Sequence, residues 1–329
     1  MRPVLSFRSI LSACVLLTLG VVSTGSALAQ AAYPDKPVRF VVPYPPGGGT
    51  DVIARIVQDR FQALLGQPII IDNKGGAGGS VGSELAARAA PDGYTVLFTL
   101  SSHTINPAIY PKLSFDTIKD FESIGTVASL PQILVANPQV PANTVAELVA
   151  LAKAKPELLA YASVGNGSPG HLAGELFKLR TGTQMTHIPY RGGGPAVTDV
   201  ISGQVPLLWV SIPAAAQFVK AGKLKALAVS TLKRSAAFPD VPTVQETGVP
   251  DFEVDSWYAM FVPARTPQPV IDRLNRTLNN IVAEPGIRDK LLAQGAEGVG
   301  GTPQTLTRIV AAEIPKWAKL AKDANIKAD

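Results

Sequence analysis

The stretch that decides the fold is Val41-Val42-Pro43-Tyr44-Pro45-Pro46-Gly47-Gly48-Gly49-Thr50-Asp51, in which an apolar run passes through a glycine-rich turn into a helical pattern. A second stretch of the same design is Tyr161-Ala162-Ser163-Val164-Gly165-Asn166-Gly167-Ser168-Pro169-Gly170-His171. Each would place bare backbone N–H groups and the positive end of a helix dipole at the carboxyl end of a strand, which favours an anion. Two such stretches, far apart in the sequence, predict two lobes that close on one anionic ligand.

Strand and helix patterns alternate along almost the whole chain. Residues 38–43 are apolar except for Arg39, which is typical of a buried parallel strand, and residues 51–65 repeat apolar side chains along one helical face. Further strands are expected at 69–71, 94–100, 132–136, 159–163, 185–189, 205–210, 225–230 and 254–262, and further helices at 80–90, 144–155, 169–181, 195–202, 214–221, 267–283 and 303–322. This alternation predicts an α/β fold with parallel sheets.

Two extended stretches, Ile124–Ala136 and Asp251–Val262, contain no helical pattern. We interpret them as two strands that cross between the lobes. Lobe 1 would then be discontinuous, formed by residues 30–130 and 254–329, and lobe 2 would be formed by residues 131–253.

The N-terminus has the pattern of a secretory signal peptide. Arg2 and Arg8 form a positive segment, residues 10–22 are apolar but too short to span a bilayer, and Ala27-Leu28-Ala29 is a cleavage signal. Residues 1–29 are therefore predicted to be removed after Ala29, with export to the periplasm. The alternative is processing as a lipoprotein at Leu11-Ser12-Ala13-Cys14, but this site follows Arg8 so closely that almost no apolar segment precedes it.

Composition and charge exclude several classes of protein. Cys14 is the only cysteine, so the mature chain has neither disulfides nor thiol catalysis. The net charge is +5, but Lys and Arg are dispersed, whereas nucleic-acid-binding proteins gather them on one face. A weakly positive field suits an acidic small molecule, and no second apolar stretch approaches the length of a membrane span.

The second glycine-rich stretch contains Gly165-x-Gly167-x-x-Gly170, a literal match to the dinucleotide-binding fingerprint. That fingerprint requires an acidic residue at the end of the next strand, where this chain has Ile188-Pro189-Tyr190-Arg191. Dinucleotide binding is therefore not expected. Ser168 is interpreted as the N-cap of the following helix, with Pro169 at its first position, and the glycines around it indicate a ligand that approaches the backbone.

The first glycine-rich loop lacks the Gly-Lys-Ser/Thr ending of a phosphate-binding loop. Thr50 is expected to cap the helix, and Asp51 in its first turn is favoured by the helix dipole whether or not it binds a ligand. Ser101 and Ser102 follow another predicted strand. Because the carboxyl ends of strands face the crevice of an open α/β sheet, these two hydroxyls are candidate ligand contacts.

Aromatic residues are scarce, so their positions carry information. Tyr44 borders the first loop, Tyr190 ends a strand, and Trp209 and Trp257 lie near predicted strand ends. Taken singly, each is explained as a core residue. Together they would wall a pocket for an organic anion.

Nothing in the sequence indicates catalysis. The three histidines are His103, His171 and His187, and no nucleophile elbow, zinc-binding motif or paired nucleophile and base is recognisable around them. We therefore expect a protein that is not an enzyme, with no cofactor and no metal site.

Several long motifs, in order, resemble the Bug family, the substrate-binding proteins of tripartite tricarboxylate transporters. The resemblance covers nearly the whole mature chain. The motifs that carry it are Tyr33-Pro34 with the stretch from Val38 to Asp51, Gly165 to Phe177, His187-Ile188-Pro189-Tyr190-Arg191-Gly192-Gly193-Gly194-Pro195-Ala196, and Ala221-Gly222-Lys223-Leu224-Lys225-Ala226-Leu227-Ala228-Val229.

The resemblance implies a two-lobed periplasmic binding protein of the type II-like, Venus-flytrap kind, with two parallel-sheet domains joined by two crossover strands. It implies a carboxylate ligand held by backbone amides, hydroxyls and bridging water. With the reasoning above, the candidate ligand-binding residues are Tyr44, Gly48, Gly49, Thr50, Asp51, Ser101, Ser102, Ser163, Gly165, Asn166, Gly167, Ser168, His171, Tyr190 and Ser211. The expected partners are a small di-, tri- or aromatic carboxylic acid and membrane transporter subunits, with no nucleic acid, and the protein is expected to be a monomer.

Two departures from the family pattern bear on the ligand. After Gly203-Gln204-Val205 the family usually has Asp, but this chain has Pro206, and Val210 stands where several members carry an acid. An acid there would hold a ligand amine, so its absence argues against amino acids. Two alternatives to transport stay open: a ligand sensor that presents its ligand to a signalling receptor, and an exported hydrolase.

Overall fold

The apolar run ahead of the first glycine-rich loop forms the centre of a sheet in the computed structural model, which describes residues 33–110, 112–190 and 193–326. Strand β1 (Val38–Val42) pairs in parallel with β2 (Ile69–Asn73) on one side and with β3 (Thr95–Leu100) on the other. Phe40 of β1 packs edge to face on Phe61 of helix α2 (Gly49–Leu65), with ring centroids 5.3 Å apart. The signal peptide predicted for residues 1–29, Cys14 included, lies outside the described residues.

The strands that continue this sheet are antiparallel. Strand β9 (Asp255–Pro263) pairs antiparallel with β3 and with β4 (Phe121–Ala136), and β10 (Glu297–Gly300) pairs antiparallel with β4. The expectation of purely parallel sheets is therefore wrong for this part. The cause is the topology: β9 re-enters this lobe from the other one, so it runs against the strands beside it.

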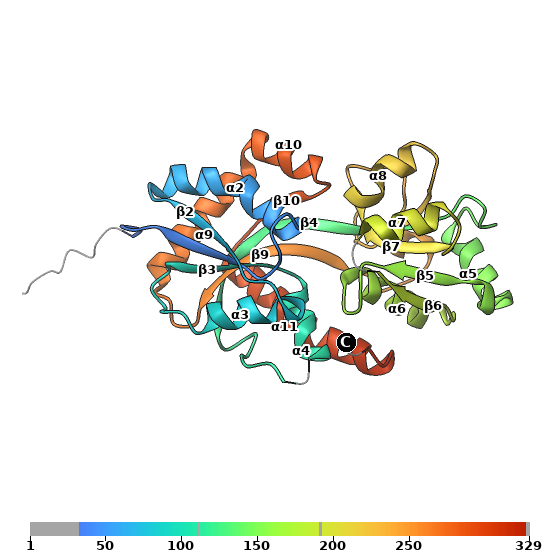
Figure 1. The fold of residues 1–329 in the computed structure, drawn as a ribbon, viewed down its shortest axis with the longest axis horizontal. Coiled ribbons are helices and arrows are strands. Elements are labelled where there is room, and N and C mark those ends of the chain that lie inside the picture. Colours follow the sequence, from blue (N-terminus) through green and yellow to red (C-terminus); the bar gives the residue numbers. More distant parts are fainter. Residues whose placement is uncertain (1–32, 111, 191–192, 327–329) are drawn as a thin grey trace, which may run out of the picture. The chain divides into compact units, whose positions relative to one another are not determined.

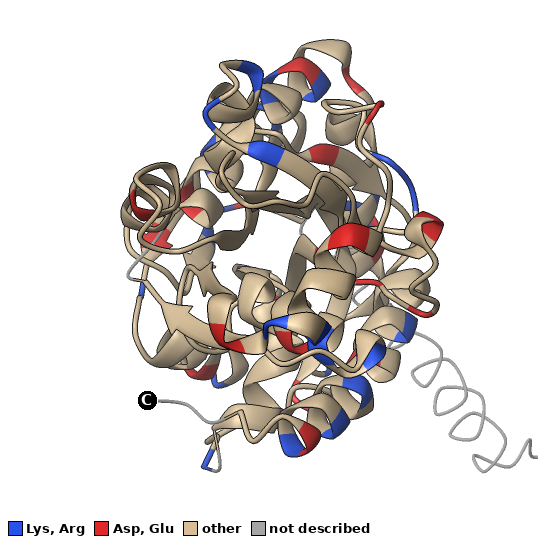
Figure 2. Ribbon diagram, turned by 90° about the vertical axis from the view of Figure 1, so that its right-hand side faces the viewer, with Lys and Arg blue, Asp and Glu red and all other residues tan. Residues whose placement is uncertain are grey.

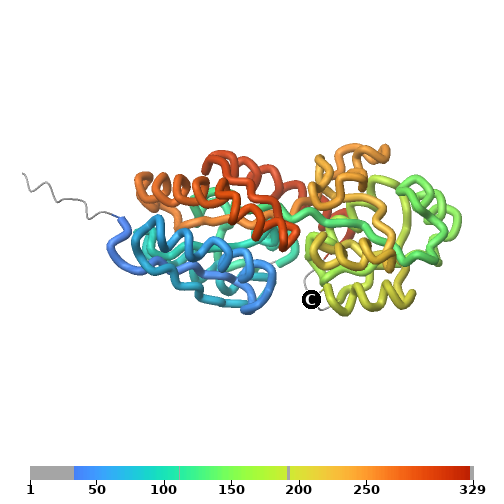
Figure 3. The backbone as a smooth tube through the Cα atoms, turned by 90° about the horizontal axis from the view of Figure 1, so that it is seen from above, coloured from blue at the N-terminus to red at the C-terminus, as the bar shows by residue number. Residues whose placement is uncertain are grey.

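A second sheet is built on the other half of β4. There β4 pairs antiparallel with β7 (Leu207–Ser211) and β8 (Lys225–Val229). Strand β5 (Ala160–Ser163) lies between β7 and β6 (Thr186–Pro189) and is parallel to both. Strand β4 thus belongs to both sheets, as its green ribbon shows in Figures 1 and 3, and the fold has two lobes.

Helices cover both sheets. In addition to α2 they are α3 (Ser80–Ala87), α4 (Ser102–Ile109), α5 (Val145–Ala154), α6 (Pro169–Thr181), α7 (Gly193–Ile201), α8 (Ile212–Lys220), α9 (Gln268–Ala283), α10 (Pro285–Ala293) and α11 (Pro303–Asp323). Helices α4 and α10 and strand β10 were not expected. The first contains Pro107 inside the helix, a position that proline disfavours, and the second begins with Pro285-Gly286, a pair that is typical of turns.

Helix α2 begins earlier than expected. Its first residue is Gly49 and its N-cap is Gly48, which makes no side-chain cap. The expectation that Thr50 caps this helix is therefore wrong, because Thr50 already lies inside the first turn. The start of the helix presents backbone alone.

The C-terminal helix contacts both lobes. Helix α11 packs on α4 and β4, and it also contacts α6 of the second lobe. Its residues Trp317 and Leu320 share one hydrophobic cluster with Tyr161 and Phe177 of that lobe. Acidic and basic residues are interspersed over the ribbon, as Figure 2 shows, and among the described residues no helix is long and apolar enough to cross a membrane.

Candidate functional site

A cavity of about 340 Å³ lies where the first turns of two helices from different lobes meet. Helix α2 follows β1, and helix α8 follows β7, so both begin at the carboxyl ends of parallel strands, where ligands bind in open α/β sheets. The lining residues are Gly47, Gly49, Val52, Ile53, Leu130, Ser211, Pro213, Ala214, Tyr258 and Gln294. This set includes no charged side chain, so the charge preference of the cavity comes from the helix starts.

The loop that opens α2 is held by a buried carboxylate. Asp51 accepts hydrogen bonds from the Gly47 N–H at 2.8 Å, from Arg55 Nε at 2.9 Å and from Asn73 Nδ2 at 3.0 Å. Burial alone raises the pKa of Asp51, but the hydrogen bonds from Arg55, Gly47 and Asn73 hold that pKa below its ordinary value. Gly47 has φ +78°, a left-handed conformation that favours glycine.

The predicted residues of this loop therefore have different positions relative to the cavity. Gly49 lines the cavity, whereas Thr50 and Asp51 do not and are each 2% exposed. Both carboxylate oxygens of Asp51 are engaged within the protein, so Asp51 orients the loop. Gly48 caps the helix and is partly exposed.

Tyr44 and the two predicted serines form a neighbouring polar group. The Tyr44 hydroxyl is hydrogen-bonded to Ser102 Oγ and lies 3.4 Å from Thr99 Oγ1. Ser102 Oγ also donates to the Gly78 carbonyl at 3.3 Å. Ser101 Oγ is buried and has no hydrogen-bond partner among the described residues. None of these side chains lines the cavity at the α2 start.

Tyr258 of β9 is a candidate site residue that was not predicted from the sequence. It is 4% exposed and lines the cavity, and a Cβ atom on Gly49 would lie 2.8 Å from its hydroxyl oxygen. That hydroxyl therefore sits on the first turn of α2, and within the described residues nothing hydrogen-bonds to it. Burial raises the pKa of Tyr258, which keeps its hydroxyl protonated and able to donate.

The second lobe contributes the start of α8 to the same cavity. Ser211 is the N-cap of α8, but its side chain makes no cap hydrogen bond, so its hydroxyl is available to a ligand. Pro213 and Ala214 line the cavity beside it. Of the two predicted helix starts, that of α2 lines this cavity, while its lobe 2 side is lined by the start of α8.

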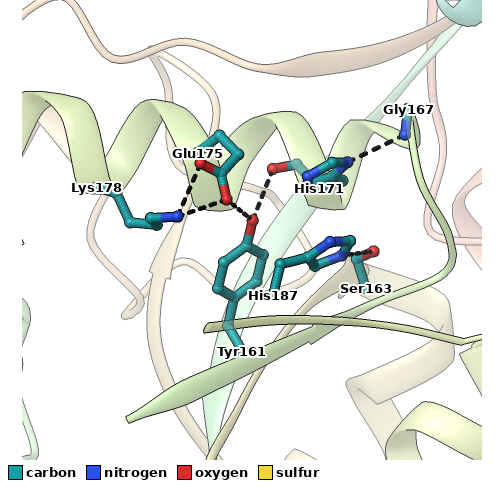
Figure 4. Close-up of polar contacts among 7 residues, drawn as sticks. All are labelled: Tyr161, Ser163, Gly167, His171, Glu175, Lys178 and His187. Carbon is teal, nitrogen blue, oxygen red and sulfur yellow. Dashed lines mark hydrogen bonds and ion pairs between the residues drawn. The ribbon is translucent and has the colours of Figure 1, made fainter. Parts of the chain in front are cut away.

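In the second predicted stretch, ahead of α6, two backbone N–H groups are hydrogen-bonded to other residues of the same stretch. The Gly165 N–H donates to Ser163 Oγ at 3.2 Å. The Gly167 N–H donates to His171 Nδ1 at 3.1 Å, as Figure 4 shows. Ser168 is the N-cap of α6 and accepts the His171 N–H at 3.2 Å, which confirms the prediction for this helix start. Asn166 lies between these two glycines and also has an interaction partner.

The histidines of this lobe belong to a packed polar network. His171 stacks on His187 with ring centroids 3.8 Å apart. Behind them, the Tyr161 hydroxyl donates to Glu175 Oε1 at 2.6 Å, and Lys178 pairs with the same carboxylate at 2.8 Å (Figure 4). These contacts join α6 to β5 and β6.

One contact in this network differs from expectation. Ser163 Oγ lies 2.7 Å from His187 Nε2, so a serine and a histidine are paired, although no such pair was recognisable in the sequence. Ser163 is 0% exposed, and its hydroxyl also contacts the Gly165 carbonyl at 3.1 Å. A substrate has no access to this oxygen, so the pair fixes the loop.

The remaining aromatic candidates are structural in this conformation. The Tyr190 hydroxyl donates to Asp199 Oδ2 at 2.6 Å, and burial together with this carboxylate raises the pKa of Tyr190 to about 12. Trp209 is 0% exposed and stacks on Phe252. Trp257 is 3% exposed, so both tryptophans are core residues.

A larger cavity of about 670 Å³ lies elsewhere, beside the end of α4. Its lining includes Asp116 and Asp120, whose charges repel an anion, and its lining among residues 33–110, 112–190 and 193–326 includes no start of a long helix. Among the described residues, no group of His, Cys, Asp and Glu is arranged to hold a metal ion. The cavity between α2 and α8 is therefore the candidate site.

Two sheets linked by a shared strand, with helix starts facing each other across a cleft, define a periplasmic solute-binding protein fold. The family model for the tripartite tricarboxylate transporter family receptor matches residues 53–326. The chain belongs to this family of receptors, in which the Bug proteins are also found.

Individual relatives agree with this assignment. Protein BugT of Bordetella pertussis is 37% identical over 314 residues, which is 95% of each chain. The structure of the periplasmic binding protein BugD is 35% identical, with a TM-score of 0.75 over 90% of this chain and 100% of that one. The structure of Rpa4515 of R. palustris with adipate is 36% identical, with a TM-score of 0.78 over 90% of this chain and 99% of that one.

Proposed function

We propose that this protein captures an organic carboxylate in the cavity between α2 and α8 and delivers it to a tripartite tricarboxylate-type transporter in the membrane. The observation that carries the proposal is the convergence of two helix starts and two hydroxyls, those of Tyr258 and Ser211, on one cavity. Among the described residues, neither hydroxyl has a hydrogen-bond partner and no charged side chain lines the cavity. An anion there is stabilised by the helix dipoles and by backbone N–H donors.

The chemistry of the site is that of binding. Gly49 leaves the first turn of α2 open, so a carboxylate oxygen can approach the backbone N–H groups closely. Charge-assisted hydrogen bonds from N–H and O–H groups to a carboxylate are stronger than neutral ones. Because one donor set lies on each lobe, an anion between them favours the closed form of the cleft.

The setting of this activity is the periplasm. Family membership and the carboxylate in the Rpa4515 structure support a transport role, and the N-terminal signal of residues 1–29 supports export with cleavage after Ala29. The partners in this proposal are an organic acid and the membrane subunits of the transporter, with the binding protein acting as a monomer and without catalysis.

Thermal-shift measurements on the chain from Gln30 onward test this proposal against a panel of carboxylates. A ligand that binds only the folded protein adds about 2.7 kcal/mol of stability at a hundredfold excess over its dissociation constant. At least one carboxylate is expected to raise the melting temperature in this way. A panel that leaves the melting temperature unchanged would refute carboxylate capture.

A matched pair of glycine variants locates the site. In Gly49→Ala, the added methyl group lies 2.8 Å from the Tyr258 hydroxyl oxygen and fills the space at the helix start, so the ligand-induced shift should disappear while the protein stays folded. In Gly286→Ala, also in the first turn of a helix, the methyl group meets nothing within 4 Å, and the shift should be retained.

A further inference from the structure

The turn between α10 and β10 touches the other lobe. A Cβ atom on Gly295, which follows the last turn of α10, would lie 2.6 Å from Cγ and 2.7 Å from Cδ of Pro213. Pro213 lies in the first turn of α8, in the second lobe. Figure 1 shows the end of α10 beside α8. The two lobes therefore meet at a glycine and a proline ring, and a methyl group on the glycine would overlap that ring.

The backbone conformation of Gly295 does not account for this closeness. Gly295 has φ +65° and Gly182, at the end of α6, has φ +62°, so both have the left-handed conformation that favours glycine after a helix. A Cβ atom on Gly182 would meet nothing within 4 Å, whereas one on Gly295 would overlap Pro213. Gly182 thus serves its own helix, and Gly295 also serves a contact between the lobes.

Both sides of this contact are held firmly. The Gly295 N–H donates to the Leu292 carbonyl at 2.7 Å, and the next N–H, that of Ala296, donates to the Leu291 carbonyl at 2.9 Å. Strand β10 follows at once and pairs with β4. On the other side, the pyrrolidine ring fixes the φ angle of Pro213. Two firm surfaces in contact form a stop, because neither yields to a closer approach.

The stop lies at the edge of the candidate cavity. Gln294, the residue before Gly295, lines the cavity together with Pro213 of α8 and Gly49 of α2. The separation of the lobes at Pro213 therefore governs the distance between the helix starts of α2 and α8. Hydrogen bonds weaken steeply once donor and acceptor move beyond about 3.2 Å, so a small change in this separation decides whether both lobes reach one anion.

We propose that Gly295 and Pro213 are positioning residues that fix the width of the closed cavity and thereby the affinity for the carboxylate. This inference rests on the proposed function and adds to it the contact that limits closure. Because carbon atoms pack at about 3.5–4.0 Å, a methyl group on Gly295 would hold the lobes about 1 Å further apart at this contact. The donors of the two lobes would then no longer reach the same anion together.

Calorimetric titration with adipate compares Gly295→Ala with Gly182→Ala in the chain from Gln30 onward. Both substitutions place alanine in the same left-handed conformation, and only the first meets Pro213. Gly295→Ala should weaken adipate binding by about tenfold, which corresponds to a tenfold smaller fraction of the closed form, and Gly182→Ala should leave it unchanged. Equal adipate affinities in the two variants would overturn the proposal.

A double-mutant cycle assigns the loss to the contact itself. Pro213→Ala removes Cγ and Cδ, the two atoms that a Cβ atom on Gly295 would overlap. In the Pro213→Ala background, Gly295→Ala should therefore weaken adipate binding by no more than about threefold. A loss as large as in the wild-type background would show that the proline ring plays no part, and would also overturn the proposal.

Distances between two spin labels test the stop separately from ligand capture. The chain from Gln30 onward contains no cysteine, so labels attach only at Lys290→Cys on α10 and Lys220→Cys on α8, both at exposed positions. With and without adipate, Gly295→Ala should lengthen the smallest label distance that the wild type reaches, and Pro213→Ala should shorten it.

The label distances and the carboxylate panel separate the two proposals. Unchanged smallest distances in both variants would overturn the stop even where adipate binds, and Pro213→Ala alone decides if Gly295→Ala does not fold. Changed distances in a protein that no carboxylate stabilises would refute carboxylate capture, while the stop between the lobes would stand.

Discussion

Replacing Asp51 with alanine tests what holds the first glycine-rich loop in place. The Asp51 side chain is 3% exposed and accepts hydrogen bonds from Gly47, Arg55 and Asn73. A hydrogen bond to a charged group contributes about 1.5–3 kcal/mol, whereas the i,i+4 pair with the exposed Arg55 contributes about 0.3–0.5 kcal/mol. Taking the Gly47 and Asn73 bonds at the lower end, since both donors regain water, Asp51→Ala should lower the free energy of unfolding by about 3 kcal/mol.

Urea denaturation at pH 7, followed by circular dichroism, measures this loss. Asp59→Ala is the matched control, because Asp59 lies on the same helix and is exposed, and its effect should stay within about 0.5 kcal/mol. The folded-state pKa of Asp51 lies below its ordinary value of 3.8, so its contribution is present above that pH and is lost as the pH falls through the folded-state pKa. A loss as small as that of Asp59→Ala would refute the anchoring role.

Ser168→Ala should lower the free energy of unfolding by about 1 kcal/mol, because Ser168 caps α6 by accepting the His171 N–H; an unchanged urea midpoint would contradict this. Burial raises the pKa of Asp255 from 3.8 to about 6, so the folded protein binds this proton more tightly and the contribution to stability is lost as the pH rises through that range. The free energy of unfolding of Asp255→Asn, relative to that of the wild type, should therefore rise between pH 4 and pH 8 by on the order of 2 kcal/mol. Parallel curves of stability against pH would argue against this. Adipate should bind at least tenfold more tightly than 2-aminoadipate in calorimetry, since no acidic side chain of the described residues lines the cavity and Asp51 is engaged by its own loop; tighter binding of the amino acid would disprove this.

Features that depend on neighbouring residues in the chain were predictable from the sequence. Helix α6 begins and ends at the predicted residues, because Ser168-Pro169 is a local start signal and Gly182 is a local stop signal with φ +62°. The crossing strands were predictable for the same reason, since no helical period interrupts Ile124–Ala136. The residues that line the cavity at the α2 start, Gly47 and Gly49, lie within the stretch that was singled out first.

Features that depend on sheet register were not predictable. In the sequence, Tyr258 is only one residue of an apolar strand. The pairing of that strand with β4, in which Tyr258 lies opposite Ala128, brings it to the start of α2. The Ser163–His187 contact likewise arises because β5 and β6 are adjacent. A contact between a loop and the end of helix α4 likewise bears on Gly167, which was expected to contact the ligand. A Cβ atom there would lie 2.4 Å from Ile109 Cδ1, and its φ is +69°, so Gly167→Val would strain the fold as well as the loop.

The shared strand has a consequence for anyone who divides this protein. Residues Lys36–Asp329 form one compact unit, β4 supplies hydrogen bonds to both sheets, and Trp317 of α11 is buried at 1% exposure in a cluster with Tyr161. A gene fragment that encodes residues 131–253 alone would lack that cover and the first half of its own central strand. The lobes should therefore melt in a single cooperative step, and a reporter inserted into a surface loop will serve biosensor design better than splitting the chain between them.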